Sequence, residues 1–427
     1  MRLIRGNVAN AADNNKNGKE INNMKVLVIN CGSSSLKFRL MEMDHETILA
    51  KGLCERIGSK FGHFRYEPTN AERLERDCEL PDHDAAVKLV LETLTSEEHG
   101  VIAAVDEIDA VGHRIVHGGD RFSGAACLTP DVIRDIEECS ALAPIHNPVN
   151  LMGIRACRKY MPHVHMAGVF DTAFHHTLPE EAYLYGIPYE YYKKYKIRRY
   201  GFHGMSHEYV SRRTAEVMGV PYDRCKQVIC HLGNGASITA VKNGRSVDTS
   251  MGYTPLEGII MGTRSGSIDP EIINVIAQKE NLDTQGVMDV LNYKSGIYGL
   301  SDFLSSDVRD LTKAYGKNDP NAIRALNTYV YSIVKYIGAY VTVLEGADSI
   351  TFTAGVGEHS ALIRKLVCQK LTFLGVRLND VANDNAEGEA LISLPDSKIS
   401  IYVIPTDEEL SIARQTAELV AALKERE

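Results

Sequence analysis

Short apolar runs alternate with amphipathic stretches along most of the chain. Five runs have the length and apolar character of buried strands, at residues 25–29, 164–170, 227–230, 349–353 and 399–404. Four stretches between them carry apolar side chains at helical spacing, at residues 84–94, 130–141, 148–160 and 322–345. Strands that alternate with helices are typical of α/β proteins, so the pattern predicts that fold class.

Two Gly-rich turns each join a pair of predicted strands. The first, at residues 31–35, reads Cys-Gly-Ser-Ser-Ser, and the second, at 231–237, reads His-Leu-Gly-Asn-Gly-Ala-Ser. Glycine lets the backbone approach a bulky ligand, and hydroxyl and N–H groups can hold anionic oxygens. A similar unit about 200 residues later predicts a duplicated fold whose halves face each other across a cleft. Two alternatives remain. The turns can be ordinary hairpin turns without a ligand, and the similarity between the two Gly-rich hairpins can be a coincidence.

Two further segments follow strands. Residues 354–360, Ala-Gly-Val-Gly-Glu-His-Ser, are predicted to form a Gly-rich turn before a helix, a favoured place for nucleotide phosphates or ribose. Residues 405–409 are predicted to open the last helix, with Thr406 as its N-cap. The sequence contains neither a G-x-x-x-x-G-K-[ST] P-loop nor a G-x-G-x-x-G motif. Phosphate binding is therefore predicted to depend on the hairpins.

Composition narrows the classes of function. The 427 residues are enough for two or three domains, and a net charge of −9 without a long Lys/Arg block argues against nucleic acid or an anionic membrane as the main partner. Nine scattered cysteines without a C-x-x-C pair fit a reducing cytoplasm. Residues 1–23 are polar, and we expect a disordered extension there. The helix at 322–345 contains Arg324, Asn327 and Lys335, which indicates a buried helix and not a membrane span.

Three clusters leave alternatives open. His203 and His207, and likewise His113 and His117, are four residues apart, a spacing that zinc ligands can share. No Glu directly follows His203, and His113–His117 has the pattern of a strand and turn, so zinc is the less favoured interpretation. The Tyr- and Lys-rich run at 183–200 could stack on nucleic acid, but a packing or dimer surface agrees better with the acidic chain.

Eight motifs, in order, resemble those of the acetate kinase family. They are Asn-Cys-Gly-Ser-Ser-Ser-Leu-Lys at 30–37, Gly-His-Arg-Ile-Val-His-Gly-Gly at 112–119, Phe-Asp-Thr-Ala-Phe-His at 170–175, Gly-Phe-His-Gly at 201–204, and the segments 231–237, 254–264, 355–360 and 405–410. The resemblance runs from Met24 to the end of the chain. It implies two duplicated actin-like (ribonuclease H-like) α/β domains flanking a nucleotide cleft. The expected lobes are residues 24–171 plus 409–427, and residues 172–408, with the last helix packed on the first lobe.

The resemblance also assigns roles, position by position. Catalysis falls to Arg114, Asp171, His203 and Arg264. Substrate binding falls to Arg114, Val116, Ile145, His146, Phe202 and Pro255. The nucleotide is expected at Lys37, His231, Leu232, Gly233, Asn234, Gly235, Asp307, Val308, Arg309, Gly355, Val356, Gly357, Glu358 and His359. Mg²⁺ (or Mn²⁺) is expected at Asn30 and Glu408. Four residues depart from the family pattern, namely Cys31, Ser267, His359 and Asp407, and His359 bears on the choice of nucleotide.

The expected activity is a reversible, direct in-line transfer of the ATP γ-phosphoryl group to acetate, giving acetyl phosphate and ADP. A carboxylate acceptor is already ionised, so Arg114, Arg264, His203, Lys37 and Mg²⁺ are needed to offset repulsion between two anions. Asp171 is interpreted as orienting arginines or metal-bound water. The alternatives are a propionate or butyrate kinase and, in another class, an actin-like or chaperone-like ATPase. A cytoplasmic homodimer is expected.

Overall fold

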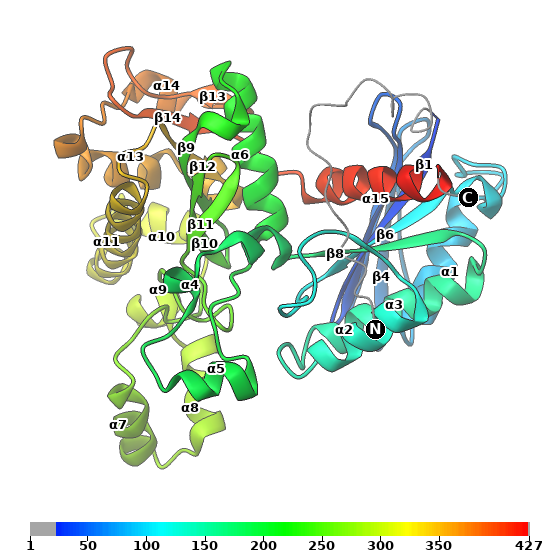
Figure 1. The fold of residues 1–427 in the computed structure, drawn as a ribbon, viewed down its shortest axis with the longest axis horizontal. Helices are drawn as coiled ribbons and strands as arrows, with labels where there is room; N and C mark the ends of the chain where they lie inside the picture. The colour runs from blue at the N-terminus through cyan, green and yellow to red at the C-terminus, as the bar shows by residue number, and fades with distance from the viewer. Residues whose placement is uncertain (1–22, 426–427) are drawn as a thin grey trace. The chain divides into compact units, whose positions relative to one another are not determined.

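The computed structural model describes residues 23–425, which divide into two compact units (Figure 1). Among the described residues, unit 1 comprises 23–117, Ala125–Phe170 and 409–425, and unit 2 comprises Gly118–Gly124 and Asp171–Glu408. The segment 118–124, which the sequence assigned to the first lobe, thus belongs to unit 2. Of the extension predicted to be disordered, residues 1–22 lie outside the described residues.

Unit 1 is built on a mixed sheet of eight strands in the order β5-β4-β3-β2-β1-β6-β8-β7. Their bounds are β1 Lys25–Gly32, β2 Ser35–Glu42, β3 Thr47–Glu55, β4 Ser59–Pro68, β5 Leu74–Leu80, β6 Ala110–Ile115, β7 Ala126–Cys127 and β8 His165–Phe170. Strands β1 and β6 are parallel, as are β6 and β8, and every other neighbouring pair is antiparallel. Because β1, β6 and β8 run in the same direction, their carboxyl ends lie at the same end of the sheet.

Helices cover both faces of this sheet. Its helices are α1 His83–Leu94, α2 Pro130–Cys139, α3 Asn147–Tyr160 and, from Glu409 onward, α15 Glu408–Lys424. A Cβ on Gly153 of α3 would lie 2.4 Å from the Cys31 sulfur, so α3 packs on the Cys31 face of β1. A Cβ on Gly112 of β6 would lie 2.4 Å from the Thr416 hydroxyl of α15. Because Gly112 pairs with Val28, whose side chain points opposite to that of Cys31, α15 covers the other face.

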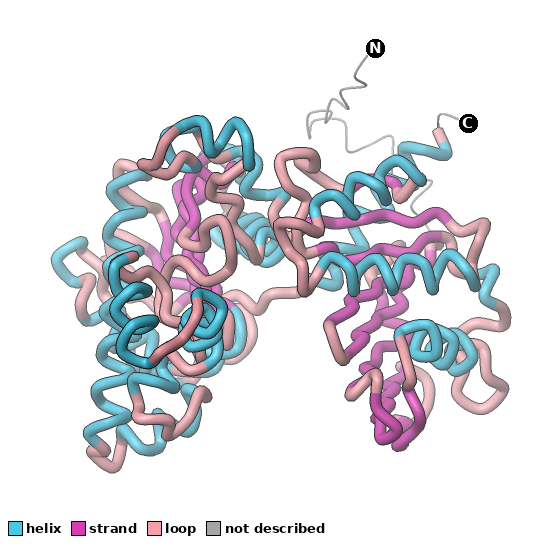
Figure 2. The backbone as a smooth tube through the Cα atoms, turned by 90° about the horizontal axis from the view of Figure 1, so that it is seen from below, coloured by secondary structure: helices cyan, strands magenta, loops and turns pink. Residues whose placement is uncertain are grey.

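Unit 2 has a six-stranded sheet in the order β11-β10-β9-β12-β14-β13. Its strands are β9 Lys226–Leu232, β10 Ala236–Lys242, β11 Arg245–Thr249, β12 Ser349–Thr353, β13 Ala390–Leu391 and β14 Ser400–Val403. Its helices are α4 Glu180–Tyr183, α5 Tyr189–Tyr195, α6 Gly204–Met218, α7 Glu271–Glu280, α8 Thr284–Tyr293, α9 Gly296–Leu300, α10 Val308–Tyr315, α11 Pro320–Val343, α12 Ala354–His359, α13 Ala361–Gln369 and α14 Asp380–Asp384. Helix α6 packs its Val210 against Ile229, so it covers the Ile229 face of β9. Figure 2 shows the strands of each unit flanked by helices.

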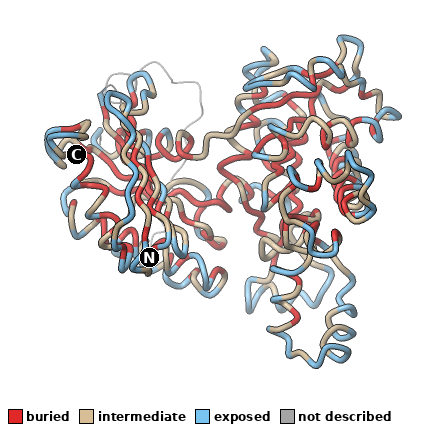
Figure 3. Tube along the Cα trace, turned by 180° about the vertical axis from the view of Figure 1, so that it is seen from behind, coloured by how far each residue is buried: buried red, intermediate tan, exposed pale blue. Residues whose placement is uncertain are grey.

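The central strands of the two sheets repeat one topology. In unit 1 the antiparallel meander β3-β2-β1 continues into parallel β6 and β8, and in unit 2 the meander β11-β10-β9 continues into parallel β12 and β14. The predicted α/β duplication is thereby confirmed. The buried residues concentrate on these strands and on the helix faces packed against them (Figure 3).

Several predicted elements shift. The strand that contains His113 spans Ala110–Ile115, and a 3₁₀ turn at Val105–Glu107 precedes it. The expected Gly-rich turn after β12 is already helical as α12, and Ala354 makes the change of direction with φ at 63°. The last helix begins at Glu408, so Thr406 is not its N-cap; the Thr406 hydroxyl donates instead to Ser206 Oγ at 2.8 Å. No helix among residues 23–425 is long and apolar enough to cross a membrane.

Candidate active site

His203 sits at a strained bend before α6. Its φ of 57° and the φ of 76° at Gly201 both fall in the left-handed region, which is unusual for histidine. The Gly204 N–H donates to the Asp171 carbonyl at 2.8 Å, and a Cβ on Gly204 would lie 2.3 Å from that oxygen. Glycine is therefore required at 204. This contact fixes the backbone of Asp171, which is only 2 % exposed, beside His203.

A buried histidine holds the bend from behind. His175 Nε2 donates to the Phe202 carbonyl at 3.0 Å, and its Nδ1 lies 2.9 Å from Ser246 Oγ. A carbonyl oxygen can only accept, so His175 carries its proton on Nε2 and Ser246 donates to Nδ1. Burial lowers the pKa of His175 to about 4, which keeps this neutral form at physiological pH.

His203 and Arg264 converge on the tip of the second hairpin. A Cβ built on Gly235 would lie 3.6 Å from His203 Nε2 and 3.4 and 3.7 Å from the two terminal nitrogens of Arg264. One small volume is thus within reach of an imidazole nitrogen and a guanidinium group. Such a pair of donors is suited to oxygens that carry negative charge.

Buried hydroxyl groups orient the histidines around this point. His203 Nδ1 lies 2.9 Å from Ser237 Oγ, and His231 Nδ1 lies 2.7 Å from Ser206 Oγ. The rings of His203 and His231 stack with their centroids 4.2 Å apart. Both imidazoles are therefore held face to face, each with its Nδ1 bonded to a serine hydroxyl.

Arg264 is anchored through the loop that contains Pro255. One terminal nitrogen donates to the Pro255 carbonyl at 3.0 Å, and the Gly258 N–H donates to Ser267 Oγ at 3.1 Å. Gly266 has φ at 70° and packs where a Cβ would lie 2.7 Å from the Gly258 carbonyl. Burial lowers the pKa of Arg264, but an arginine keeps its charge in proteins. Its position is thus fixed by backbone contacts.

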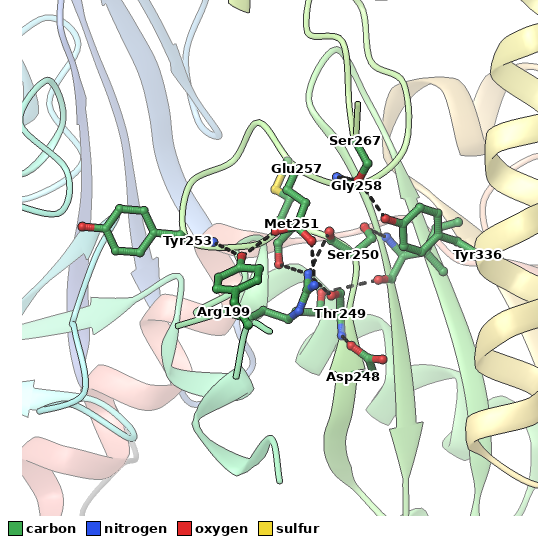
Figure 4. A network of polar contacts seen from close by, with 12 residues as sticks. Arg199, Asp248, Thr249, Ser250, Met251, Tyr253, Glu257, Gly258, Ser267 and Tyr336 are labelled. Atoms are coloured by element: carbon green, nitrogen blue, oxygen red, sulfur yellow. Dashed lines mark hydrogen bonds and ion pairs between the residues drawn. The ribbon is translucent and has the colours of Figure 1, made fainter. Parts of the chain in front are cut away.

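Arg199 ties the His203 segment to the Pro255 loop (Figure 4). One of its nitrogens donates to the carbonyls of Thr249, Ser250 and Met251 at 3.0–3.1 Å, and another donates to Glu257 Oε1 at 2.6 Å. Tyr185 donates its hydroxyl to the same carboxylate. Burial opposes the charge of Arg199, but Glu257 and the neighbouring tyrosines raise its pKa above the usual range. This network links the backbone just before His203 to the loop that carries Pro255 and Arg264.

A pocket of about 870 Å³ opens beside the same hairpin within unit 2. Eight of its lining residues were predicted to bind the nucleotide: Gly233, Asn234, Asp307, Val308, Arg309, Gly355, Val356 and His359. Its volume is within the range of small-molecule sites. Arg309 is 83 % exposed at its side chain, and two of its nitrogens bond to the Asp307 carboxylate, which lowers the pKa of Asp307. The guanidinium plane is thereby held at the pocket wall.

Three predicted nucleotide residues have packing or structural contacts in unit 2. Leu232 is fully buried at the end of β9. A Cβ on Gly357 would contact the backbone of Phe352 at 3.3 Å, so this glycine lets α12 pack closely. Glu358 accepts a hydrogen bond from the Thr406 N–H at 3.3 Å, which fixes the chain before the last helix.

The predicted residues of unit 1 gather at the end of β1. Asn30 pairs with Lys37 across the hairpin, and the parallel register that joins Ile29 to His113 places Arg114 beside Asn30 on one face. Glu409 of α15 lies over this face, where it pairs with Lys37 and, at 3.3 Å, with Arg39. Lys37 is thus held by a carboxylate that directly follows Glu408, the predicted metal ligand.

Two asparagines of α3 fix the loop that carries Val116. Asn150 accepts from the Val116 N–H at 3.1 Å and donates to the Cys31 carbonyl at 3.0 Å. Asn147 accepts from the His117 N–H and donates to the His117 carbonyl. Of the other predicted substrate residues, Phe202 is buried, whereas Ile145 is 62 % exposed just before α3. His146 is exposed as well.

Sequence reasoning missed the supports of this site. It named His203, His231 and Arg264 as site residues but gave no role to Ser206 and Ser237, which bond to the two histidines, or to Glu257, which bonds to Arg199. The missed signal is the alternation along β9 and β10: Ser237 pairs with His231, so both face α6, where His203 begins the helix. A polar pair on an inward strand face next to a histidine motif could have drawn attention to these serines.

The donor set agrees with a hard divalent cation bound together with phosphate. Among residues 23–425, no three His, Cys, Asp or Glu side chains are grouped so that they could hold a metal ion. The predicted ligands Asn30 and Glu408 supply oxygen atoms, and Mg²⁺ is commonly held by one or two such groups plus substrate phosphates. The spacing of His203 and His207 left zinc binding as an alternative. In the structure one nitrogen of each ring instead bonds to the Ser237 hydroxyl.

Comparison with known proteins identifies the family. The model of the acetokinase family matches residues 25–414. The chain belongs to the acetokinase family. It is 54% identical over 398 residues to the acetate kinase of Agathobacter rectalis, covering 93% of this chain and 100% of the relative. It is also 54% identical over 399 residues to the acetate kinase of Thermotoga maritima, covering 93% and 99%.

Solved structures agree with this membership. The acetate kinase of Porphyromonas gingivalis superimposes with a TM-score of 0.89 at 44% identity, covering 93% of this chain and 100% of that chain. A propionate kinase from Francisella tularensis reaches 0.86 at 37% identity, covering 92% and 99%. As a member of the acetokinase family, the protein is a phosphotransferase with a carboxyl group as acceptor, and ATP is its phosphoryl donor.

Proposed function

We propose that this protein transfers the γ-phosphoryl group of ATP to acetate, reversibly, by direct in-line displacement, giving acetyl phosphate and ADP. The observation that carries the proposal is the convergence of His203 Nε2 and Arg264 on Gly235. Gly235 directly follows Gly233 and Asn234, which line the 870 Å³ pocket. A nucleotide in that pocket can therefore extend its terminal phosphate toward both donors.

The chemistry needs charge compensation and not a base. Acetate is ionised at neutral pH, so no proton has to leave the nucleophile, whereas two anions must be brought into contact. Arg264 and His203 donate to the equatorial oxygens of the transferring group, and Arg264 is held for bidentate contact by its bond to Pro255. Asp171 serves to orient cationic groups or water and does not accept a proton from substrate.

Nucleotide binding is assigned to the walls of the pocket. The phosphates are assigned to the hairpin tip at Gly233 and Asn234, which lines this pocket and is closed by a hydrogen bond from the Gly233 N–H to the Gly235 carbonyl at 3.1 Å. The Arg309 guanidinium, held by Asp307, presents a planar face on which a base can stack. His359 lines the same pocket and replaces the asparagine of the family pattern. The choice between adenine and other bases is therefore expected to depend on His359.

The residues proposed for the acceptor are Arg114, Val116, Ile145 and His146 of unit 1 and Phe202 and Pro255 of unit 2. Arg114 holds the acetate carboxylate, and its neighbour Val116 contributes to an apolar pocket for the methyl group. The other proposed pocket residues are Ile145, His146, Phe202 and Pro255. Arg114 belongs to unit 1 and Arg264 to unit 2.

Asn30 and Glu408 are the residues that would hold the divalent cation, which neutralises charge on the ATP phosphates when bound. Lys37 adds a fixed positive charge on the same hairpin. Glu409 pairs with Lys37 and Arg39, so that the helix carrying Glu408 is seated on this face. Mg²⁺ is the expected ion, with Mn²⁺ as its substitute.

The proposal also covers how the protein assembles. We expect a homodimer in the cytoplasm. In the Tyr-rich run, α5 exposes Tyr189 and Tyr195, and Lys193 and Lys194 lie over these two rings. This face is a candidate contact between two copies. Light scattering after size exclusion tests the dimer, and a monomer at micromolar concentration would contradict it.

The experiment that tests the function is acetyl phosphate formation with a series of acceptors. We expect kcat/KM to be highest for acetate, lower for propionate and lowest for butyrate. One methylene changes selectivity by only about 1–3 kcal/mol, so the ratios should be roughly 10- to 100-fold. A preference for propionate or butyrate would assign the protein to that acceptor instead. ATP hydrolysis without any acyl phosphate would favour an actin-like ATPase.

A further inference from the structure

Ser237 lies between two histidines. Its Oγ is 2.9 Å from His203 Nδ1 and 2.7 Å from His207 Nε2, and Ser237 and His207 are both fully buried. The three side chains come from two elements, since Ser237 is on β10 and both histidines belong to the start of α6. The result is a hydrogen-bonded chain that ends at His203 Nε2, the atom that faces Gly235.

The protons in this chain can be counted. Burial and two neighbouring histidines hold the pKa of His207 well below its usual range, so this ring is neutral and carries one proton. The Ser237 hydroxyl has one proton and donates to one imidazole only. Ser237 is fully buried, and its Oγ contacts the two imidazoles, so accepting from both would leave its own proton without an acceptor. Ser237 therefore donates to one ring and accepts from the other, which leaves two possible directions for the hydrogen bonds along the chain.

The surroundings of His207 show in which direction the hydrogen bonds run. His207 Nδ1 is buried and has no hydrogen-bond partner in the structure. If Ser237 donated to His207 Nε2, the proton of His207 would sit on Nδ1 and leave a buried N–H without an acceptor. Buried N–H groups of that kind are rare in folded proteins. If His207 Nε2 donates to Ser237, Nδ1 keeps only a lone pair, and Ser237 donates to His203 Nδ1.

We propose that His207 and Ser237 are positioning residues that hold neutral His203 in the tautomer with its proton on Nε2. A nitrogen that accepts from Ser237 at Nδ1 must carry the ring proton on the other side. His203 Nε2–H then points to the volume beside Gly235 and Arg264. This inference rests on the proposed function in one respect, because that volume is where the transferring phosphoryl group is placed.

The consequence concerns what His203 needs in order to work. A neutral imidazole that exchanges between its two tautomers would have an unprotonated Nε2 for part of the time. The lone pair of that nitrogen would repel the phosphoryl oxygens. A fixed Nε2–H is a donor without a prior protonation step, and it is oriented before substrate binds. Such preorganised donors are the usual source of electrostatic stabilisation in active sites.

The direct test is the tautomer itself. In protein labelled with ¹⁵N-histidine, two-bond ¹H–¹⁵N correlations distinguish Nε2–H from Nδ1–H, and His203→Gln assigns the signals. In the substrate-free wild-type protein we expect His203 as the Nε2–H form. In Ser237→Ala we expect that preference to be lost, and kcat to fall roughly tenfold, the range for one hydrogen bond. An Nδ1–H form in the wild type, or an unchanged His203 signal in Ser237→Ala, would overturn the inference.

Variants of His207 separate positioning from simple support. In His207→Gln the amide nitrogen can still donate to Ser237, so His203 should keep the Nε2–H form and most of kcat. In His207→Leu nothing donates to Ser237, so that Ser237 can accept from His203, and we expect a shift to the Nδ1–H form. Equal spectra and equal kcat for the Gln and Leu variants would overturn the proposal.

Ser211→Ala is the matched control. Ser211 lies on the same helix, is fully buried and bonds its hydroxyl to Tyr222 at 2.8 Å, away from His203. This variant should lower thermal stability as much as Ser237→Ala but leave the His203 tautomer and kcat unchanged. A shifted tautomer in Ser211→Ala would show that the signal reports general loosening and would overturn the inference. Because the spectra need no substrate, they judge it independently of acetyl phosphate formation.

Discussion

The first and second units share one strand topology but use it differently. In unit 2 the hairpin of β9 and β10 carries little charge itself, and the donors come from elsewhere: His203 from the start of α6 and Arg264 from a braced loop. In unit 1 the charged residues lie on the strands themselves, with Lys37 on β2 and Arg114 on β6. The two units thus share the arrangement of their central strands but differ in whether the predicted charged residues lie on the strands or on the neighbouring helix and loop.

The supports of the two sites differ in the same way. His203 and His231 are fixed by buried serine hydroxyls and by a strained backbone at 201–203. In unit 1, Lys37 is held by an acidic partner, since Glu409 pairs with Lys37 and with Arg39. A rigid set of donors suits the transferring phosphoryl group, which needs defined geometry. The Lys37 side chain is half exposed, so its charge can also be reached from solvent, as the proposed contact with the ATP phosphates requires.

The largest expected difference concerns Arg264. Arg264→Ala removes one of the two groups that meet at Gly235, so kcat should fall about 10²–10³-fold, as for the loss of one preorganised donor. The KM for ATP should change much less, because Arg264 does not line the nucleotide pocket. Steady-state kinetics with both substrates measure this. Arg309→Ala is the contrasting variant, with the loss expected in ATP binding.

Arg114→Ala tests the assignment of unit 1 to the acceptor. Loss of a charge-assisted contact of about 1.5–3 kcal/mol should raise the acetate KM roughly 10- to 100-fold. ATP binding, measured by calorimetry, should remain close to wild type. If ATP binding collapsed while the acetate KM stayed the same, Arg114 would belong to the nucleotide and the comparison between the units would be reversed.

A smaller effect is expected for Glu408→Ala. Without one of two proposed protein ligands, half-maximal activity should require several-fold more Mg²⁺, while activity at saturating metal is partly restored. A titration of Mg²⁺ at fixed ATP measures the shift. Glu409→Ala is the matched control, because it removes the neighbouring carboxylate, which pairs with Lys37 and Arg39. An unchanged metal requirement in Glu408→Ala would reject it as a ligand.

The last expected effect concerns stability instead of activity and is shared by both units. Burial lowers the pKa of His113 to about 3 and of His117 to about 4 in unit 1, and that of His175 to about 4 in unit 2. The unfolded chain binds these protons near pH 6.5, so stability is fully present above that pH and is lost as pH falls toward 4. The slope is about 1.4 kcal/mol per pH unit for each histidine. Denaturant unfolding at several pH values measures this, and His175→Gln should flatten the curve.

Much of the architecture was predictable because it depends on local patterns. The run at 25–29 and the strand at 349–353 follow from apolar content, and α11 follows from apolar residues at helical spacing. The duplication was visible as two Gly-rich hairpins. The errors lie where tertiary contacts override local signals. At 354–359 the glycines suggested a turn, but close packing of Gly357 on Phe352 lets a helix begin directly.

The motif residues themselves could be named from the sequence, but their partners could not. Ser237 and His207 are 30 positions apart, and Arg199 and Glu257 are 58 positions apart. No local pattern joins such pairs, because each bond forms only after strands and helices have packed. The same holds for Glu409, which lies 370 positions from Arg39.

The sequence by itself determined the α/β class, the repeated hairpins and the set of charged and imidazole groups, since these follow from the order of residues along the chain. The tertiary structure decided which nitrogen of each histidine meets a serine, which carboxylate meets each cation, and that His203 and Arg264 share the space beside Gly235. The physical reason is that hydrogen bonds and ion pairs act over a few ångströms, and only the packed fold brings distant residues that close.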